Sequence, residues 1–101
     1  MALTGVQVMK LRSMAHKLDP AVTVGKAGVT DGLVKQVEDA LEAHELVKCS
    51  VMPNIGMTAS EAAAALCERL GAETVQVIGR KFSLYRKTRR KDVESIVLPQ
   101  A

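Results

Sequence analysis

The feature that most constrains the fold is a helix-start signal that occurs three times, centred each time on a threonine. Thr4 is followed three residues later by Gln7, and Thr58 by Glu61, which is the capping-box pattern of a helix N-terminus. Thr30 is a third candidate N-cap, because apolar residues with helical spacing follow it. The chain must therefore accommodate three helices within 101 residues.

Short runs rich in β-branched residues lie between these helices and after the last one, which is typical of strands. We expect strands at residues 21–24, 46–52, 74–78 and 81–86. Gly79-Arg80 stands between the last two strands and favours a tight hairpin turn. The first helix should end at Asp19-Pro20, because proline disfavours helical geometry in the residue before it.

The order of these elements, α-β-α-β-α-β-β, predicts an α/β fold with a four-stranded mixed sheet. Strands joined through a helix pair in parallel by right-handed crossovers, whereas a closing hairpin is antiparallel. So short a chain can hardly fill helical layers on both faces, and we expect the helices mainly on one face. We expect one domain over 1–101, with its core in 3–87 and a basic C-terminal segment in 86–101. Within that segment, 92–98 either adds an edge strand or stays irregular.

Positive charge is concentrated near the C-terminus. Seven basic residues and no acidic residue lie between positions 80 and 91, whereas the other 89 residues hold seven basic and eleven acidic residues, a net charge of −4. A polarised basic surface attracts polyanions, most often nucleic acid, and a solvated basic tail is the alternative. The seven basic residues are Arg80, Lys81, Arg86, Lys87, Arg89, Arg90 and Lys91.

A second feature suited to an anion is the stretch Gly25-Lys26-Ala27-Gly28, which precedes the second helix. Glycine lacks the Cβ that keeps another chain at a distance and permits positive φ, so successive N–H groups can point outward. The helix N-terminus adds N–H donors and a partial positive charge, and Lys26 adds a full charge. A GxxG loop clamps the nucleic-acid backbone in KH domains. An ordinary strand-to-helix turn is the alternative, and the P-loop pattern is absent.

Neither a metal site nor a catalytic centre is indicated. His16 and His44 stand near predicted helix ends without a partner at i, i+4, and Cys49 and Cys67 lack CxxC spacing. We expect both thiols to be buried and free, with a disulfide as the less favoured alternative. No nucleophile, base and acid form a set, so we expect no enzyme activity and no cofactor.

The aromatic content bears on how a nucleic-acid ligand would be recognised. The chain contains only two aromatic residues, Phe82 and Tyr85, and a partly buried strand position is the favoured interpretation of Tyr85. Because base stacking relies on aromatic rings, we expect contact with phosphate and sugar rather than a readout of base sequence.

The second helix carries four acidic residues that are expected on its solvated face, namely Glu38, Asp39, Glu42 and Glu45.

Four blocks, in order and at compatible spacing, resemble the YhbY family, the free-standing form of the CRM domain (chloroplast RNA splicing and ribosome maturation). The likeness covers roughly residues 3–87 and is far more specific than the GxxG pattern alone. The blocks are Leu11-Arg12 with Ala15-His16, Leu18 and Pro20; Val24 to Gly28 with Thr30; Ala40-Leu41 with His44 to Lys48; and Val75 to Gly79 with Leu84 to Arg86. The charge run from Lys87 to Lys91 is not a family block.

The resemblance implies a compact α/β domain similar to the C-terminal domain of translation initiation factor three. It also implies an RNA-binding protein that acts on precursors of the large ribosomal subunit, with ribosomal RNA as its partner. The family's loop carries over onto Gly25, Lys26, Ala27 and Gly28. Its basic RNA-facing surface carries over onto Arg12, Lys48, Arg80, Lys81 and Arg86.

Other functions and locations are weighed against this expectation. A protein-interaction adaptor could dock an acidic partner through the same basic strip, and a small enzyme acting on a phosphorylated metabolite could use the same loop. No apolar run approaches the roughly 18 residues of a membrane span, so we expect no membrane partner. The N-terminus lacks the basic-then-apolar layout of a secretory signal, which favours the cytoplasm.

Overall fold

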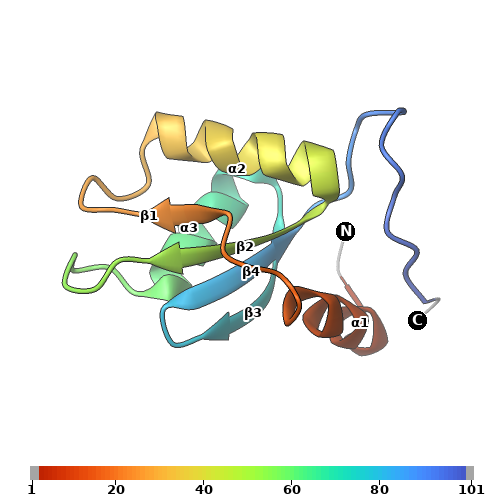
Figure 1. The fold of residues 1–101 in the computed structure, drawn as a ribbon, viewed down its shortest axis with the longest axis horizontal. Helices are drawn as coiled ribbons and strands as arrows, with labels where there is room; N and C mark the ends of the chain where they lie inside the picture. The colour runs from red at the N-terminus through yellow and green to blue at the C-terminus, as the bar shows by residue number, and fades with distance from the viewer. Residues whose placement is uncertain (1–2, 100–101) are drawn as a thin grey trace.

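The computed structural model describes residues 3–99, so residues 1–2 and 100–101 of the expected domain lie outside the described range. Three helices and four strands form within that range, in the order expected from the sequence (Figure 1). The elements are α1 (Gly5–Ala15), β1 (Val22–Val24), α2 (Asp31–His44), β2 (Leu46–Val51), α3 (Ala59–Leu70), β3 (Glu73–Ile78) and β4 (Lys81–Tyr85). The α/β fold class is thereby confirmed.

Each predicted helix start carries its threonine cap. The side chain of Thr4 accepts a hydrogen bond from the N–H of Gln7 at 3.2 Å, and Thr58 accepts one from Glu61 at 3.1 Å. In both boxes the residue in the third position accepts a hydrogen bond in return from the threonine N–H. At the start of α2, the side chain of Thr30 accepts a hydrogen bond from the N–H of Leu33. These short-range bonds satisfy backbone donors that a helix N-terminus leaves free.

The four strands form one mixed sheet in the order β1-β2-β4-β3. β1 and β2 are parallel, as expected for strands joined through α2, and the other two pairs are antiparallel. The β3–β4 ladder shifts register between Thr74 and Gln76, so Val75 is an extra residue in β3.

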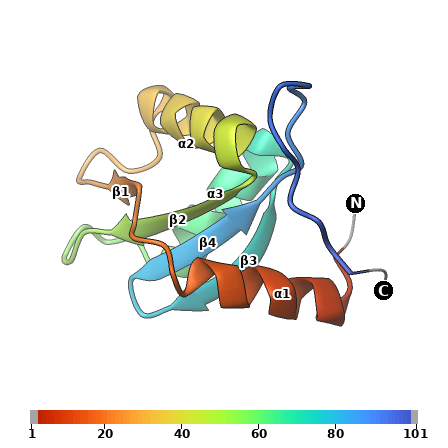
Figure 2. The same cartoon turned by 45° about the vertical axis from the view of Figure 1, so that its right-hand side comes forward.

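Side-chain alternation separates the sheet into two faces with different partners. Val47 and Cys49 point to one face, where α2 and α3 enclose the main hydrophobic core. Leu46 points to the other face, where it packs with Leu11 of α1 and with Tyr85. α1 crosses only one end of this second face (Figure 2). The expectation of helices mainly on one face is met by α2 and α3, and α1 leaves part of the opposite face uncovered.

Two segments differ from a simple reading of the sequence. α1 ends at Ala15 rather than at Asp19-Pro20. The N–H groups of Lys17 and Leu18 donate to carbonyls three residues earlier, as in a 3₁₀ turn, instead of four residues earlier as in an α-helix. The described part of the C-terminal segment forms no strand, and Ile96 packs against the smaller core. Within residues 3–99, no helix has the length and apolar character that crossing a membrane requires.

Candidate nucleic-acid interface

The GxxG loop forms a tight turn between β1 and α2. The N–H of Gly28 donates to the carbonyl of Gly25 at 2.9 Å, and Gly28 has a φ of 73°. This positive φ favours glycine at position 28, because a side chain would be strained there. Lys26 and Ala27 form the exposed tip. Since Thr30 caps α2 directly after the turn, the tip stands beside a helix N-terminus.

Arg80 and Lys81 lie at the same end of the molecule as this loop. The N–H of Met52 donates to the carbonyl of Val24 at 3.0 Å, and the N–H of Val51 donates to the carbonyl of Arg80 at 2.8 Å. These two bonds connect the end of β1 to the β3–β4 turn through β2. Figure 1 shows the β1–α2 loop and the β3–β4 turn at the left of the sheet. Both basic residues are exposed, and we call residues 25–28 with Arg80 and Lys81 the loop end.

The uncovered part of the sheet continues from the loop end. Cross-strand pairing arranges the side chains beyond α1 in two rows, which are predominantly polar or basic. The first row contains Thr23, Ser50, Lys81 and Ile78, and the second contains Lys48, Ser83 and Gln76. In the first row the hydroxyl groups of Thr23 and Ser50 lie 3.1 Å apart. A polar surface therefore extends from the loop end toward α1.

Arg12 and Lys48, two of the expected RNA contacts, lie where α1 meets this face. Nε of Arg12 donates to the carbonyl of Val75 at 3.1 Å, and Nζ of Lys48 donates to the carbonyl of Ala15 at 3.4 Å. Arg12 is exposed, whereas Lys48 is half-buried. Each cation thus helps to attach α1 to the sheet and still contributes positive charge to the surface.

β4 divides the basic segment from Arg80 to Lys91 into two regions. Arg80 and Lys81 lie at the start of β4, whereas Arg86 follows its end. There the N–H of Arg86 donates to the carbonyl of Glu45, at the C-terminal end of α2. Figure 1 shows the chain after β4 at the end of the sheet opposite the GxxG loop. The structure does not form the continuous basic surface over 80–91 that the sequence suggested. We call residues 86–91 the C-terminal end.

Arg86 is a buried structural cation. Its side chain is only 9% exposed and lies 2.7 Å from a carboxylate oxygen of Glu42 and 3.8 Å from one of Glu38. Nη1 also donates to the carbonyl of Leu70 at 2.9 Å. The expectation of a surface contact at Arg86 is therefore corrected, because this guanidinium is already bound to protein groups.

The carboxylate of Glu45 is also buried, contrary to the expectation of a solvated helix face. Glu45 is fully buried and ends α2 with a φ of 64°. Its oxygens accept hydrogen bonds from the N–H of Thr88 at 2.7 Å, the N–H of Ile96 at 2.6 Å and the hydroxyl of Ser95 at 3.1 Å. Glu45 therefore attaches the chain after β4 to the domain.

Glu42 was likewise expected in solvent and is bound instead. Hydrogen bonding from the N–H of Arg89 lowers the pKa of Glu42 below 4.5, with further lowering from the Thr88 hydroxyl and the Arg86 charge. Glu38 keeps an intermediate exposure and Asp39 stays exposed, as expected. Two of the four acidic residues therefore belong to the attachment of the C-terminal segment.

The remaining basic residues of the C-terminal end are only partly available to a ligand. All four are exposed, namely Lys87, Arg89, Arg90 and Lys91. Nη2 of Arg90 lies 2.7 Å from a carboxylate oxygen of Asp92. Part of the positive charge at this end is therefore neutralised locally.

The family model of the CRS1/YhbY (CRM) domain matches residues 3–86, which is most of the chain. This chain belongs to the CRS1/YhbY (CRM) family. The resemblance found in the four sequence blocks is thereby confirmed.

Two bacterial relatives and one solved structure match this CRM chain over nearly their whole length. The probable RNA-binding protein YqeI of Bacillus subtilis is 43% identical over 97 residues, which cover 96% of this chain and 99% of that protein. An RNA-binding protein of Haemophilus influenzae is 33% identical over 92 residues, covering 91% and 93%. The solution structure of the hypothetical protein SAV1595 from Staphylococcus aureus matches with a TM-score of 0.68 at 38% identity, covering 97% of this chain and all of that one.

Sequence reasoning did not nominate the polar residues of the uncovered face. Gln76 and Ser83 lie on it because strand alternation places them opposite the α2 and α3 side. The alternation was visible in the sequence, but the position of α1, which decides how much of the face stays open, was not. The CRM domain therefore has a wider polar surface than its charge pattern alone indicated.

The cysteines of this CRM domain are both free, as expected, but only Cys49 is buried, whereas Cys67 is half-buried. Burial raises the pKa of the Cys49 thiol to about 12, which makes it unreactive near neutral pH. Burial also raises the pKa of Cys67, whose Sγ lies 3.2 Å from the Thr74 hydroxyl. Within the described residues, no group of three or more His, Cys, Asp or Glu side chains could hold a metal ion.

Proposed function

We propose that this CRM domain is a non-enzymatic RNA-binding protein that contacts the RNA backbone through the loop end. The observation that carries the proposal is the GxxG turn, which places an exposed Lys26 beside the N-terminus of α2 and at the same end as Arg80 and Lys81. The names of the relatives, two of which are called RNA-binding proteins, support the same ligand.

The chemistry of the loop end suits phosphate. A turn without bulky side chains lets a ligand approach backbone N–H groups, and a helix N-terminus favours negative charge. Asp31, the acidic residue nearest to the loop in the sequence, forms an ion pair with Arg69, with Oδ1 and Nη2 2.8 Å apart. Among the described residues, Lys26, Arg80 and Lys81 take part in no ion pair. Their charges are therefore available to phosphates.

Arg12 and Lys48 extend this proposed surface toward α1, whereas Arg86 is left out of it because its guanidinium is bound inside the protein. The other cations of the C-terminal end, Lys87, Arg89, Arg90 and Lys91, are assigned a secondary role. They stand at the opposite end of β4 and can meet only a longer or folded RNA that reaches both ends.

Recognition at the loop end depends on the backbone and shape of the RNA. The two aromatic side chains of the sequence, Phe82 and Tyr85, are 1% and 5% exposed. Neither ring can offer a stacking platform without a rearrangement of the core. Phosphate and sugar contacts therefore provide most of the affinity.

We further propose that the RNA is ribosomal RNA in precursors of the large ribosomal subunit and that the protein acts in the cytoplasm. Family resemblance supports this finer assignment. Co-sedimentation with ribosomal particles on a sucrose gradient tests it: the protein should travel with precursors of the large subunit in a ribonuclease-sensitive way. Capture of an acidic partner that persists after ribonuclease treatment would support the adaptor function instead.

The loop is tested by Lys26→Ala, alone and combined with Gly28→Ala. RNA affinity, measured by fluorescence anisotropy, should fall in the single variant and fall further in the double variant, because a Cβ at position 28 strains the turn. Lys35→Ala is the matched control, since Lys35 is an exposed lysine of α2 paired with Asp39. If about five phosphates are neutralised, log K should fall against log salt with a slope near −3 to −4. Unchanged affinity in the folded double variant would remove the loop from the site.

A further inference from the structure

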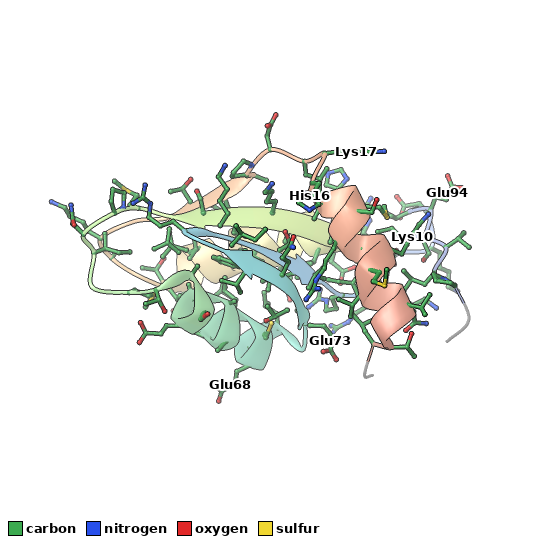
Figure 3. All side chains as sticks on the ribbon, turned by 90° about the horizontal axis from the view of Figure 1, so that it is seen from below. Lys10, His16, Lys17, Glu68, Glu73 and Glu94 are labelled. Atoms are coloured by element: carbon green, nitrogen blue, oxygen red, sulfur yellow. The ribbon has the colours of Figure 1, made fainter. Side chains whose placement is uncertain are left out.

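A cavity of about 210 Å³ opens on the uncovered sheet face beside the end of α1. Figure 3 shows this face, with α1 across one end of the strands and His16 at the end of the helix. The cavity lies outside the GxxG loop. Its lining comes from His16, Lys48, Gln76, Ile78, Lys81, Phe82 and Ser83.

The local sequence explains why a hollow forms here. Each strand places alternate residues on this face, and in the second row Lys48, Ser83 and Gln76 are neighbours. α1 runs across the strands over the row of Leu46, and the row of Lys48 lies beside the helix, nearer the middle of the sheet (Figure 3). The floor of the cavity is therefore a strip of sheet that no helix covers.

The lining combines positive charge with neutral hydrogen-bonding groups. It contains two lysines and a histidine but no acidic residue. Lys48 is held in place by its contact with the carbonyl of Ala15, at 3.4 Å, and it offsets the partial negative charge of this helix end. Ile78, which is 56% exposed, supplies an apolar side. Positive charge, amide and apolar surface together match a nucleotide better than a metal ion or a hydrocarbon.

The size of the cavity limits what it can hold. At about 210 Å³ it is smaller than the roughly 300–1,000 Å³ typical of pockets for complete small-molecule ligands. One unit of a longer chain fits this description, because the rest of the chain can lie on the open surface around the cavity. The row of Thr23, Ser50 and Lys81 provides such a surface between the cavity and the loop end.

We propose that this cavity receives one unstacked base of the bound RNA, with its phosphate toward Lys48 and Lys81 and its edge toward the amide of Gln76. The proposal rests on the RNA-binding function proposed above and adds a base-reading contact to a surface that otherwise senses only backbone. A glutamine amide presents one donor and one acceptor side by side, which matches the N6 amino group and N7 of adenine. The Watson–Crick edges of unpaired cytosine and uracil also offer such a pair. Adenine is the expected base because its larger ring also buries more apolar surface against Ile78.

The test compares oligo(A), oligo(U) and oligo(C) of equal length, fluorescein-labelled, by anisotropy at one fixed salt concentration. The wild-type chain should bind oligo(A) roughly fivefold or more tightly than the other two, within the range of one good bidentate base contact. Gln76→Leu keeps the size of the side chain and should abolish this preference. Gln36→Leu, at an exposed position of α2, is the matched control and should retain it.

A direct readout separates a contact from an indirect structural effect. In an NMR titration with adenosine monophosphate as the probe, the side-chain amide of Gln76 and the ring of His16 should shift at lower concentration than the loop at Gly25–Gly28. Shifts confined to the loop would overturn the proposal. The same spectra show whether each variant is folded.

The outcomes distinguish this inference from the function on which it rests. Equal binding of the three oligonucleotides by the wild-type chain, or an intact preference in folded Gln76→Leu, would reject the proposed adenine site while leaving backbone binding in place. Absence of binding to all three by the wild-type chain would reject both.

Discussion

The loop end and the C-terminal end carry the same kinds of basic residues, but the structure uses their charges differently. Lys26, Arg80 and Lys81 are exposed and take part in no ion pair within residues 3–99. At the C-terminal end, Arg86 is buried against Glu42. Arg90 is exposed but pairs with Asp92. Charge density in a sequence therefore does not locate a polyanion site by itself, because nearby acids decide which charges remain available.

The difference follows from the cost of burying charge. A buried guanidinium needs both an opposite charge and hydrogen-bond acceptors, and Arg86 obtains them from Glu42 and the carbonyl of Leu70. Its Nε is the one buried side-chain polar atom of the described residues without a partner. The loop end buries no charge, so its cations keep their hydration until a ligand replaces it. One end thus contributes to the structure of the domain, and the other is suited to a ligand.

Removal of Arg86 is the largest expected perturbation. Arg86→Met should lower the free energy of unfolding by about 3 kcal/mol, because it leaves Glu42 without its cation and the Leu70 carbonyl without a donor. Arg89→Met, at an exposed position of the same segment, should change stability by less than about 0.5 kcal/mol, because its side chain makes no ion pair within residues 3–99. Urea unfolding of both variants checks the contrast. Equal small losses would mean that the Arg86 contacts contribute little to stability.

Removal of equal charge from the two ends sharpens the comparison for RNA. The triple variant Lys26→Ala, Arg80→Ala, Lys81→Ala should weaken RNA binding roughly tenfold or more and make the salt slope shallower by about 2, at about 0.7 per phosphate. The triple variant Lys87→Ala, Arg89→Ala, Lys91→Ala removes the same charge at the C-terminal end and should change affinity less than about threefold. Anisotropy over a salt series measures both. The reverse ranking would move the site to the C-terminal end.

The smallest expected effect is a change in how stability depends on pH at the C-terminal end. The hydrogen bond from the N–H of Arg89 contributes most to the lowered pKa of Glu42. A carboxyl group with a lowered folded pKa stabilises the protein above its ordinary pKa of 4.5, and this contribution is lost as pH falls through the folded value. Glu42→Gln removes the counter-charge of the buried Arg86, so it should lower stability at neutral pH and also flatten the fall in stability below pH 4.5. Glu68→Gln, at an exposed position of α3, should keep the wild-type pH profile, and matching profiles for all three proteins would contradict the assignment.

The helices, strands and their order could be predicted because each depends on residues close in the chain. The capping bonds of Thr4 and Thr58 span three residues, and the left-handed end of α3 falls on Gly71. The end of α1 was predicted less well. Its last turn tightens after Ala15, where the Lys48 side chain from β2 meets the helix carbonyl. This contact joins residues 33 apart, which a local pattern does not reveal.

The candidate site was only partly predictable for the same reason. The GxxG turn is local, and its expected residues lie together at the loop end with Arg80 and Lys81. The position of α1 decides that the face with Gln76 stays open, and Ser83 on the same face is buried at 3% exposure. Glu45 was misassigned because its helix pattern is that of a solvent residue, whereas its three hydrogen-bond donors come from positions 88–96.

The amino-acid sequence by itself determined the helix caps, the order of helices and strands along the chain, the glycine turn and membership of the CRS1/YhbY (CRM) family, all of which are expressed in short-range patterns. Only the tertiary structure decided which charges are neutralised and which remain exposed. The physical reason is that ion pairing and burial depend on chain segments brought together by folding, as Arg86 and Glu42 are across 44 positions.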